Sequence, residues 1–260
     1  MGRLNDNPRI QRAVMKAMIF AAGLGTRLRP LTDTVPKALV PVGGVPMLER
    51  VARKLGKASL GPIVVNVCHL ADKVENFVEG RDLGVKILLS REDGLEPLET
   101  GGGIKHAARL LDGRFLLHNV DMLSDLDIRQ FVSRDDPDSL ATLLVNDRPS
   151  DRYLLFDDDM RLVGWTNVLT GQVKGPAAGK DISKFRRYAF CGIHIISAEK
   201  AFPLMDGWPE RFGIMDFYLD ACSTQLIRGV VADMLNIIDI GSPETLAEAE
   251  RAVSQGLFAL

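Results

Sequence analysis

The stretch KAMIFAAGLGTRLRPLTDTVPKALVPV, residues 16–42, decides the fold and the position of the functional site. It begins with an unbroken apolar run, residues 17–22, which predicts a strand buried on both faces. Gly23 and Gly25 follow directly, and two glycines let the backbone turn tightly and approach a ligand closely. Successive backbone N–H groups in such a turn form an anion-binding nest. The stretch therefore predicts a phosphate-binding loop at the end of a buried strand.

Two basic side chains follow this loop and are candidates for binding phosphate oxygens. Arg27 offers the bidentate donors that suit phosphate, and Lys37 lies between Pro36 and Pro41, which stiffen its segment. Two common glycine motifs do not fit. The dinucleotide fingerprint requires a third glycine where Leu28 stands, and the Gly-Lys-Ser/Thr end of the phosphate loop of nucleoside triphosphatases is absent.

The rest of the chain alternates between strand and helix patterns. Strands are expected at residues 62–68, 85–89, 114–119, 139–145, 153–156, 161–165, 188–197 and 235–239, and helices at 47–58, 71–79, 104–111, 126–133 and 244–253. Such alternation implies crossover connections and a mostly parallel sheet. The expected fold is a Rossmann-like α/β three-layer sandwich with a mostly parallel mixed central sheet, whose ligands bind beyond the carboxyl ends of the strands.

Composition and charge describe an ordinary globular chain. With 260 residues, of which 46% are hydrophobic, we expect a single domain over residues 16–260, preceded by a polar N-terminal extension, residues 1–15. A net charge of −2 and the lack of an apolar run of about 18 residues indicate neither a nucleic-acid nor a membrane partner. Three scattered cysteines and no secretory h-region indicate the reducing cytoplasm. The oligomeric state stays open.

Aspartates near strand ends are candidates for binding a metal. Asp121 comes directly after the strand at 114–119, which suits a magnesium ligand. Asp125 and Asp127 are better placed to cap the following helix. Residues 157–159, all aspartates, lie between two short strands and are expected to form a hairpin turn.

The string G-x-G-T-R-L-R-P-L-T followed by P-K-A-L-V-P-V resembles the signature of the sugar-1-phosphate nucleotidyltransferases. The resemblance implies an enzyme that joins a nucleoside triphosphate to a sugar 1-phosphate and releases pyrophosphate. The nucleophile is an ionised phosphate, so catalysis needs positioning and charge neutralisation rather than a general base. The resemblance gives Arg27 and Lys37 catalytic roles and assigns four residues to the nucleotide: Ala22, Gly23, Gly25 and Thr26.

Three further segments match the family in part. The stretch ETGGGI, residues 99–104, is expected to form a loop over the base, and the closing motif DIGSP at 239–243 implies that Asp239 joins Asp121 in holding Mg²⁺. The FCGI strand at 190–193 implies a glycine that faces the sugar, within a sugar-binding part at about residues 146–200. The candidates for the base site are Glu99, Thr100, Gly101 and Gly102, and those for the sugar site are Asn119, Asn167 and Gly192.

Neither the base nor the sugar is decided by these motifs. The compact length and the ETGGGI segment look like the N-acetylmuramate 1-phosphate uridylyltransferases of cell-wall sugar recycling, so UTP with a hexosamine 1-phosphate is the preferred pair. Alternatives are GTP with mannose 1-phosphate, a phosphocholine-type cytidylyltransferase, and a non-catalytic sensor of the same fold. The intact Arg27, Lys37, Asp121 and Asp239 argue against a sensor.

Overall fold

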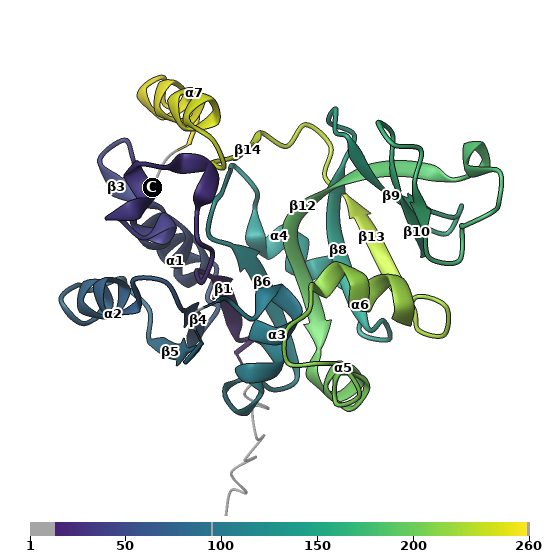
Figure 1. Ribbon diagram of the computed structural model, residues 1–260, viewed down its shortest axis with the longest axis horizontal. Coiled ribbons are helices and arrows are strands. Elements are labelled where there is room, and N and C mark those ends of the chain that lie inside the picture. The colour runs from purple at the N-terminus through teal and green to yellow at the C-terminus, as the bar shows by residue number, and fades with distance from the viewer. Residues whose placement is uncertain (1–13, 95, 259–260) are drawn as a thin grey trace, which may run out of the picture.

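A mixed β-sheet runs through the centre of the molecule (Figure 1). The computed structural model describes residues 14–94 and 96–258, so most of the expected N-terminal extension lies outside the described residues. Within that part of the chain, ten strands form one sheet. They are β1 (Ala17–Phe20), β4 (Ile63–Val67), β5 (Ile87–Arg91), β6 (Arg114–Asn119), β8 (Ala141–Asn146), β9 (Arg152–Phe156), β10 (Leu162–Asn167), β11 (Val173–Lys174), β12 (Arg186–Ser197) and β13 (Ile227–Val231).

The sheet has a parallel part and an antiparallel part. Its main path has the order β11-β10-β9-β12-β6-β1-β4-β5, and β8 pairs with both β12 and β13. β1 lies between β4 and β6 and pairs in parallel with both, which explains why its four residues are all buried and apolar. β12 runs antiparallel to β6, β8 and β9. The expectation of a mixed central sheet is confirmed, and its parallel part is the one that carries the glycine loop.

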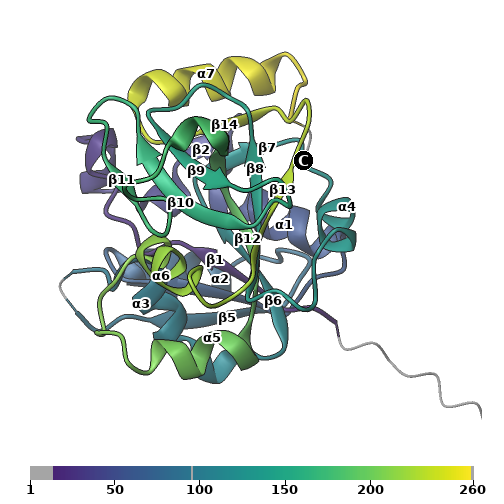
Figure 2. The same cartoon turned by 90° about the vertical axis from the view of Figure 1, so that its right-hand side faces the viewer.

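Helices cover both faces of the sheet and give three layers. Along β1, Ala17 and Ile19 face one hydrophobic cluster, whereas Met18 and Phe20 face another. The helices are α1 (Met47–Lys57), α2 (Ala71–Glu79), α3 (Glu99–His106), α4 (Ile128–Ser133), α5 (Ala198–Met205), α6 (Ile214–Ala221) and α7 (Pro243–Ser254). The first cluster contains residues of α1, α2, α4 and α7, and the second contains residues of α3, α5 and α6. Figure 2 shows α7 and α5 at opposite ends of the view with strands between them.

Two small ribbons lie outside the main sheet. β7 (Met122–Ser124) pairs antiparallel with β14 (Ile237–Asp239), and β2 (Pro41–Val42) pairs with β3 (Val45–Pro46). Among the described residues, no helix is long and apolar enough to cross a membrane.

The expected roles of several aspartates can be checked against this fold. Asp127 caps α4, since its carboxylate accepts a hydrogen bond of 3.1 Å from the backbone N–H of Gln130. Asp157 holds the β9–β10 turn by accepting from the backbone N–H groups of Asp159 and Arg161. Both expectations are confirmed. Asp125 does not cap α4: it accepts from the backbone and side chain of Asn236, and so ties β7 to the segment that leads into β14.

The glycine-rich segment at 99–104 differs from the expected loop. α3 begins at Glu99 rather than at Ile104, so Gly101, Gly102 and Gly103 are buried inside a helix. Glycine costs about 1 kcal/mol relative to alanine in a helix interior, so the helix needs another reason for three of them. Burial against a neighbouring segment supplies that reason.

Protein atoms occupy the space that side chains on these glycines would need. A Cβ atom on Gly101 would overlap the Phe212 ring, and one on Gly102 would overlap the carbonyl oxygen of Glu210. The backbone N–H groups of both glycines donate to the carbonyl oxygen of Phe212, at 2.9 and 3.1 Å. The glycines therefore let the chain leading into α6 lie directly on α3, and their conformational freedom in a loop is not the reason for them.

We expect Gly101→Ala to lower the free energy of unfolding by about 1–3 kcal/mol, because the added methyl group overpacks the contact with Phe212. Urea denaturation midpoints would measure the loss. Gly207→Ala is the matched control, since nothing lies within 4 Å of a Cβ atom at Gly207. Equal midpoints for the two variants would contradict the packing role of Gly101.

Candidate active site

The glycine loop leaves β1 and turns sharply at Gly25. Gly25 has φ 64°, a conformation that favours glycine, and its carbonyl oxygen accepts a hydrogen bond of 2.8 Å from the Thr32 hydroxyl. A Cβ atom on Gly25 would lie 2.8 Å from Thr32 Cγ2, whereas one on Gly23 would have nothing within 4 Å. Gly25 is therefore required by the turn itself, and the space beside Gly23 is open to a ligand.

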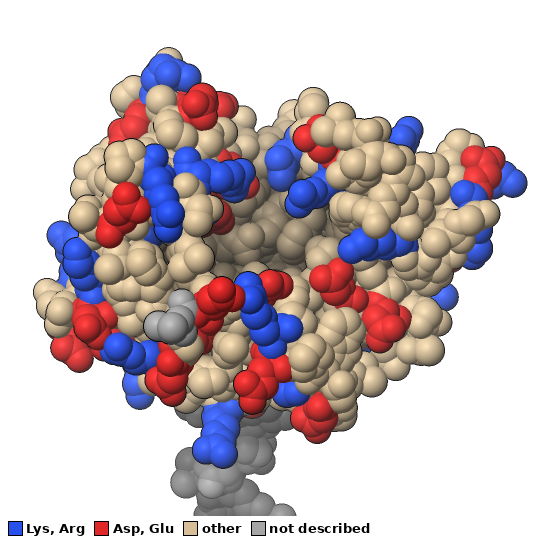
Figure 3. Space-filling view, viewed as in Figure 1, with Lys and Arg blue, Asp and Glu red and all other residues tan. Residues whose placement is uncertain are grey.

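A cavity of about 180 Å³ opens beside this loop. Figure 3 shows a hollow in the middle of this face of the molecule, with Lys and Arg side chains on both sides of the hollow. Seven residues that the sequence assigned to the site line the cavity: Ala22, Gly23, Lys37, Glu99, Thr100, Asn119 and Asp121. The other lining residues are Phe20, Ala21, Asn66, Pro97 and Val120. The lining set does not include the remaining assigned residues, Gly25, Thr26, Arg27, Gly101, Gly102, Asn167, Gly192 and Asp239, and their ligand contacts stay predictions.

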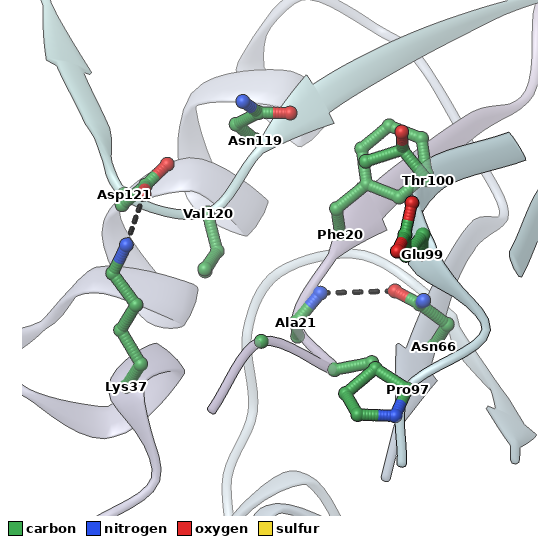
Figure 4. Close-up of a pocket in the computed structure, with 12 residues that line it drawn as sticks. Phe20, Ala21, Lys37, Asn66, Pro97, Glu99, Thr100, Asn119, Val120 and Asp121 are labelled. Carbon is green, nitrogen blue, oxygen red and sulfur yellow. Dashed lines mark hydrogen bonds and ion pairs between the residues drawn. The ribbon is translucent and has the colours of Figure 1, made fainter. Parts of the chain in front are cut away.

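A buried chain of hydrogen bonds fixes one side of this cavity, and Figure 4 shows its first bond, between Ala21 and Asn66. The backbone N–H of Ala21 donates to Asn66 Oδ1 at 2.9 Å, and Asn66 Nδ2 donates to Glu92 Oε1 at 2.7 Å. Glu92 Oε2 accepts from the backbone N–H of Leu98 at 2.8 Å. Asn66 and Glu92 are 2% and 3% exposed, so the chain of bonds is shielded from water. It holds the glycine loop and the start of α3 in a constant relative position.

Sequence reasoning missed both of these side chains. Asn66 stands in the apolar strand sequence PIVVNVC, where a polar residue must find a partner inside the protein. That mismatch was the available signal. The partner, Glu92, follows a different strand and becomes apparent only when β4 and β5 lie side by side.

The first two residues of α3, Glu99 and Thr100, line the cavity and are held in defined conformations. Glu99 has φ 64°, a left-handed conformation that is uncommon for residues other than glycine and is typical of functional sites. Its carboxylate lies 3.4 Å from the Nε atom of Arg211. Thr100 Oγ1 accepts a hydrogen bond of 2.9 Å from the backbone N–H of Ile214, which leaves the hydroxyl hydrogen as a donor for a ligand.

Asp121 and Asp239 are far apart in sequence and adjacent in the fold. Asp239 is the last residue of β14 and is paired in register with Met122, the residue after Asp121. The backbone N–H of Ile240 donates to the carbonyl oxygen of Asp121 at 2.9 Å, which continues this pairing. Two carboxylates thus lie together beside the glycine loop.

Asp239 has the properties expected of a metal ligand. Its Oδ1 atom is buried without a hydrogen-bond partner in the described structure. Burial, and next the charge of Asp121, raise the pKa of Asp239 above 3.8, while Lys37 and Arg27 act in the opposite direction. A Cβ atom on Gly241 would lie 2.9 Å from Asp239 Oδ1 and would overlap Arg27, so this glycine lets the guanidinium approach.

The two carboxylates fit a magnesium ion that also binds substrate phosphates. Mg²⁺ commonly uses one or two carboxylates together with phosphate oxygens and water. Among the described residues, no group of three or more His, Cys, Asp or Glu side chains could hold a metal ion by itself, so the two aspartates would need ligands from the substrate or from water. A bound cation would offer a partner to the orphaned oxygen of Asp239 and would favour its ionised form.

Lys37 forms an ion pair with Asp121 (Figure 4). The sequence assigned these residues to different ligands, and their direct contact was not anticipated. Both side chains are largely buried, with 14% and 18% exposed. The pair neutralises one of the two carboxylates, and the flexible lysine stem allows the ammonium group to turn towards a substrate phosphate.

Buried histidines near the site stay neutral at physiological pH. Burial lowers the pKa of His118 to about 4 and that of His194 to about 3. His194 Nδ1 is 2.8 Å from the hydroxyl of Tyr218, which agrees with the expected core position of His194. Neither imidazole is poised to act as a base near pH 7, in keeping with a reaction whose nucleophile is already ionised.

The expected sugar side is built around Gly192. Gly192 has φ 69° in an irregular part of β12, and a Cβ atom there would lie 2.8 Å from the side-chain nitrogen of Asn119. The close approach therefore brings together two predicted sugar-binding residues. Asn167 has a turn role, because its Oδ1 accepts from the backbone N–H groups of Leu169 and Thr170.

The chain is similar to a known protein family, to two uridylyltransferases and to a solved structure. Residues 16–153 match the model of the nucleotidyl transferase family. An N-acetylmuramate alpha-1-phosphate uridylyltransferase from Caulobacter vibrioides is 30% identical over 251 residues, 92% of this chain and 97% of that protein. The protein of the same description from Neisseria meningitidis serogroup B is 45% identical over 115 residues, 44% of this chain and 49% of that protein. The structure of HddC from Yersinia pseudotuberculosis complexed with GMP-PN superposes with TM-score 0.72 at 24% identity, covering 92% of this chain and 100% of that one.

These findings agree with the chemistry that the cavity can perform. A sheet edge that presents a phosphate loop, basic side chains and paired aspartates defines an enzyme of the sugar-1-phosphate nucleotidyltransferase class. The chain belongs to the nucleotidyl transferase family, so the resemblance inferred from the loop motif is confirmed. Its substrates are a nucleoside triphosphate and a sugar 1-phosphate.

We expect Asp239→Asn to raise the free energy of unfolding at neutral pH while it lowers activity. The folded-state pKa of Asp239 is raised above 3.8. As pH rises from the pKa of Asp239 in the unfolded chain to its pKa in the folded protein, the unfolded chain loses its proton first, and the free energy of unfolding falls. This lost stability is not recovered above the folded-state pKa. An asparagine does not ionise, so the variant avoids the loss. Urea midpoints from about pH 4 to pH 8 test the sign; a variant less stable than the wild type at pH 7 would contradict it.

Proposed function

We propose that this enzyme transfers a uridylyl group from UTP to N-acetylmuramate 1-phosphate or a closely related hexosamine 1-phosphate. The observation that carries the proposal is the alignment with the Caulobacter uridylyltransferase, which runs along 97% of that protein at 30% identity. The Neisseria protein of the same description supports it over the half of its length that matches.

The nucleotide is proposed to lie between the glycine loop and the first turn of α3. The backbone amides around Gly23 would cradle the triphosphate in the open space beside that residue. Glu99 and Thr100 would face the base, with the Thr100 hydroxyl as a donor. The chain of bonds through Asn66 and Glu92 would keep these two contact regions at a constant spacing.

Charge neutralisation supplies the catalysis in this proposal. A phosphate oxygen of the sugar 1-phosphate attacks the α-phosphorus, and the bond to the pyrophosphate oxygen breaks. Lys37 would stabilise negative charge at the α-phosphate, and Arg27 would bind the departing pyrophosphate. No side chain takes a proton, which is consistent with the neutral His118 and His194.

Asp121 and Asp239 are proposed to hold one Mg²⁺ ion. When bound, this ion supplies positive charge that reduces the repulsion between the two anionic substrates. Lys37 offsets the charge of Asp121, and Arg27 contributes favourably to the ionised form of Asp239.

A substrate panel tests the proposed pair directly. UTP, GTP, CTP and dTTP would each be combined with N-acetylmuramate, N-acetylglucosamine, glucose and mannose 1-phosphates, and pyrophosphate release recorded. We expect UTP with N-acetylmuramate 1-phosphate to have the highest kcat/KM. A higher value for GTP with mannose 1-phosphate would replace the proposed pair with the main alternative, and a lack of pyrophosphate release in every pair would contradict enzymatic function.

We expect activity to require a divalent cation and Asp121→Asn to lower kcat about a hundredfold to a thousandfold, the usual effect of losing one preorganised electrostatic group. The amide keeps the side-chain volume but cannot bind a hard cation as a carboxylate does. Isothermal titration of Mg²⁺ in the presence of UTP would measure the lost binding. Full activity in excess chelator, or wild-type turnover in a folded Asp121→Asn protein, would reject the metal site.

A further inference from the structure

Four buried side-chain atoms have no hydrogen-bond partner within the described residues. They are His118 Nε2, Asn146 Oδ1, Arg148 Nε and Asp239 Oδ1. Buried polar atoms are nearly always paired in folded proteins, so an unpaired one calls for a specific reason such as an absent ligand. Asp239 has that reason as a candidate metal ligand. Asn146 and Arg148 lie just two positions apart, at the start of the sugar-binding part expected at about residues 146–200, and the sequence assigned neither of them a role.

Arg148 lies beside the strand that carries Gly192. Asn146 is the last residue of β8 and pairs in register with Ala189 of β12. The Nη2 atom of Arg148 donates a hydrogen bond of 3.1 Å to the carbonyl oxygen of Phe190, two residues before Gly192. Both residues are therefore anchored on the side of the site where Gly192 approaches Asn119.

The charge of Arg148 lacks a direct partner. Within residues 14–94 and 96–258, Arg148 takes part in no ion pair, and its only hydrogen bond goes to a neutral carbonyl group. A guanidinium group with an unused Nε–H donor thus lies beside the part of β12 that carries Gly192, and Gly192 closely approaches Asn119, which lines the cavity.

The two substrates must approach the aspartates from different sides. The lined cavity and its hydrogen-bond chain belong to the loop after β1, to β4 and to α3, which together form the nucleotide side. β12 and β8 lie on the other side of β6, as the sheet order β8-β12-β6-β1 shows. Asn146 and Arg148 lie on this β8 side.

We propose that Arg148 and Asn146 form the acceptor subsite, in which Arg148 binds the phosphate group of the sugar 1-phosphate. The inference rests on the proposed reaction of a sugar 1-phosphate with a nucleoside triphosphate, but not on which base or sugar is used. The guanidinium offers Nε–H and Nη–H donors in one plane, which match two phosphate oxygens. The carbonyl oxygen of Phe190 holds this plane in place.

Asn146 complements this contact. Its side chain is 4% exposed, and its unpaired Oδ1 atom accepts a hydrogen bond from a hydroxyl or amide group of the sugar. An acceptor analogue that lacks such a donor would leave the oxygen unpaired. In this arrangement Asn146 discriminates between sugars, and it lies next to Arg148, which binds the phosphate group.

Steady-state kinetics of Arg148→Gln test the assignment, with the substrate pair that gives the highest kcat/KM in the panel. We expect KM for the sugar 1-phosphate to rise about tenfold to a hundredfold, the usual range for losing a hydrogen bond to a charged group, with KM for the nucleoside triphosphate changed less than about twofold. Inorganic phosphate, used as a competitor of the sugar 1-phosphate, should bind more weakly by a similar factor. Arg148→Lys retains the charge without the planar donors. Its KM for the sugar 1-phosphate should lie between the values of the wild type and of Arg148→Gln.

The control is Arg134→Gln. Arg134 also donates a single hydrogen bond to a strand carbonyl, 2.8 Å from Nη1 to the oxygen of Val231, and it is exposed. We expect wild-type kinetics from it. If Arg148→Gln is insoluble, Asn146→Ala provides the second measurement, with KM for the sugar 1-phosphate raised and KM for the nucleotide unchanged.

Three results would overturn the assignment. They are an unchanged KM for the sugar 1-phosphate in folded Arg148→Gln, a rise in KM for the nucleotide alone, and equal losses in Arg148→Gln and Arg134→Gln. Because every sugar 1-phosphate carries the same phosphate group, failure of the uridylyl or N-acetylmuramate assignment in the panel leaves this test intact. Failure here, in turn, leaves the identity of the preferred pair untouched.

Discussion

The site depends on the electrostatic repulsion between two adjacent carboxylates, those of Asp121 and Asp239. The other charged groups of the site lie around this pair. The pairing of β7 with β14 holds their backbones together, so they cannot separate without breaking this ribbon. Burial and mutual repulsion raise the pKa of Asp239. A cation held between the two carboxylates, as proposed, would relieve this repulsion.

Basic side chains surround this pair without neutralising it fully. Lys37 contacts Asp121 directly, whereas Arg27 and Arg148 act on Asp239 through their charge. Arg27 comes from the glycine loop and Arg148 from the segment after β8, so the cations come from both sides of the aspartates. This distribution suits a reaction that brings two phosphate-bearing substrates to one point and releases a third anion.

The side of the cavity proposed for the nucleotide is tightly packed. Gly101 and Gly102 let the chain before α6 lie directly on α3, Gly103 makes room for Asn66 and Glu92, and the bonds through these two residues join the start of α3 to the glycine loop. In the proposed arrangement, the parallel strands next to β1 serve the nucleotide, and the antiparallel strands next to β12 serve the acceptor.

The sequence by itself determined the features that depend on local pattern. Apolar runs identified the buried strands, the glycine and proline spacing around Lys37 predicted the phosphate loop, and Asp121 was a candidate because it lies two residues after a strand. The Asp127 cap and the 157–159 turn were also predictable, since such hydrogen bonds join residues only a few positions apart. Asp239 was assigned as a candidate metal ligand only because the closing motif DIGSP was considered together with the apolar strand before it.

Only the tertiary structure decided the features that join distant segments. Glycines at 101–103 look the same in sequence whether they loosen a loop or admit a neighbouring chain, and the position of Phe212 settles which it is. The Lys37–Asp121 pair, the Asn66–Glu92 bond and the place of Arg148 over β12 each join residues tens of positions apart. Residue type and spacing carry no information about such contacts, because the order of strands in the sheet, and not the order of residues in the chain, decides which side chains meet.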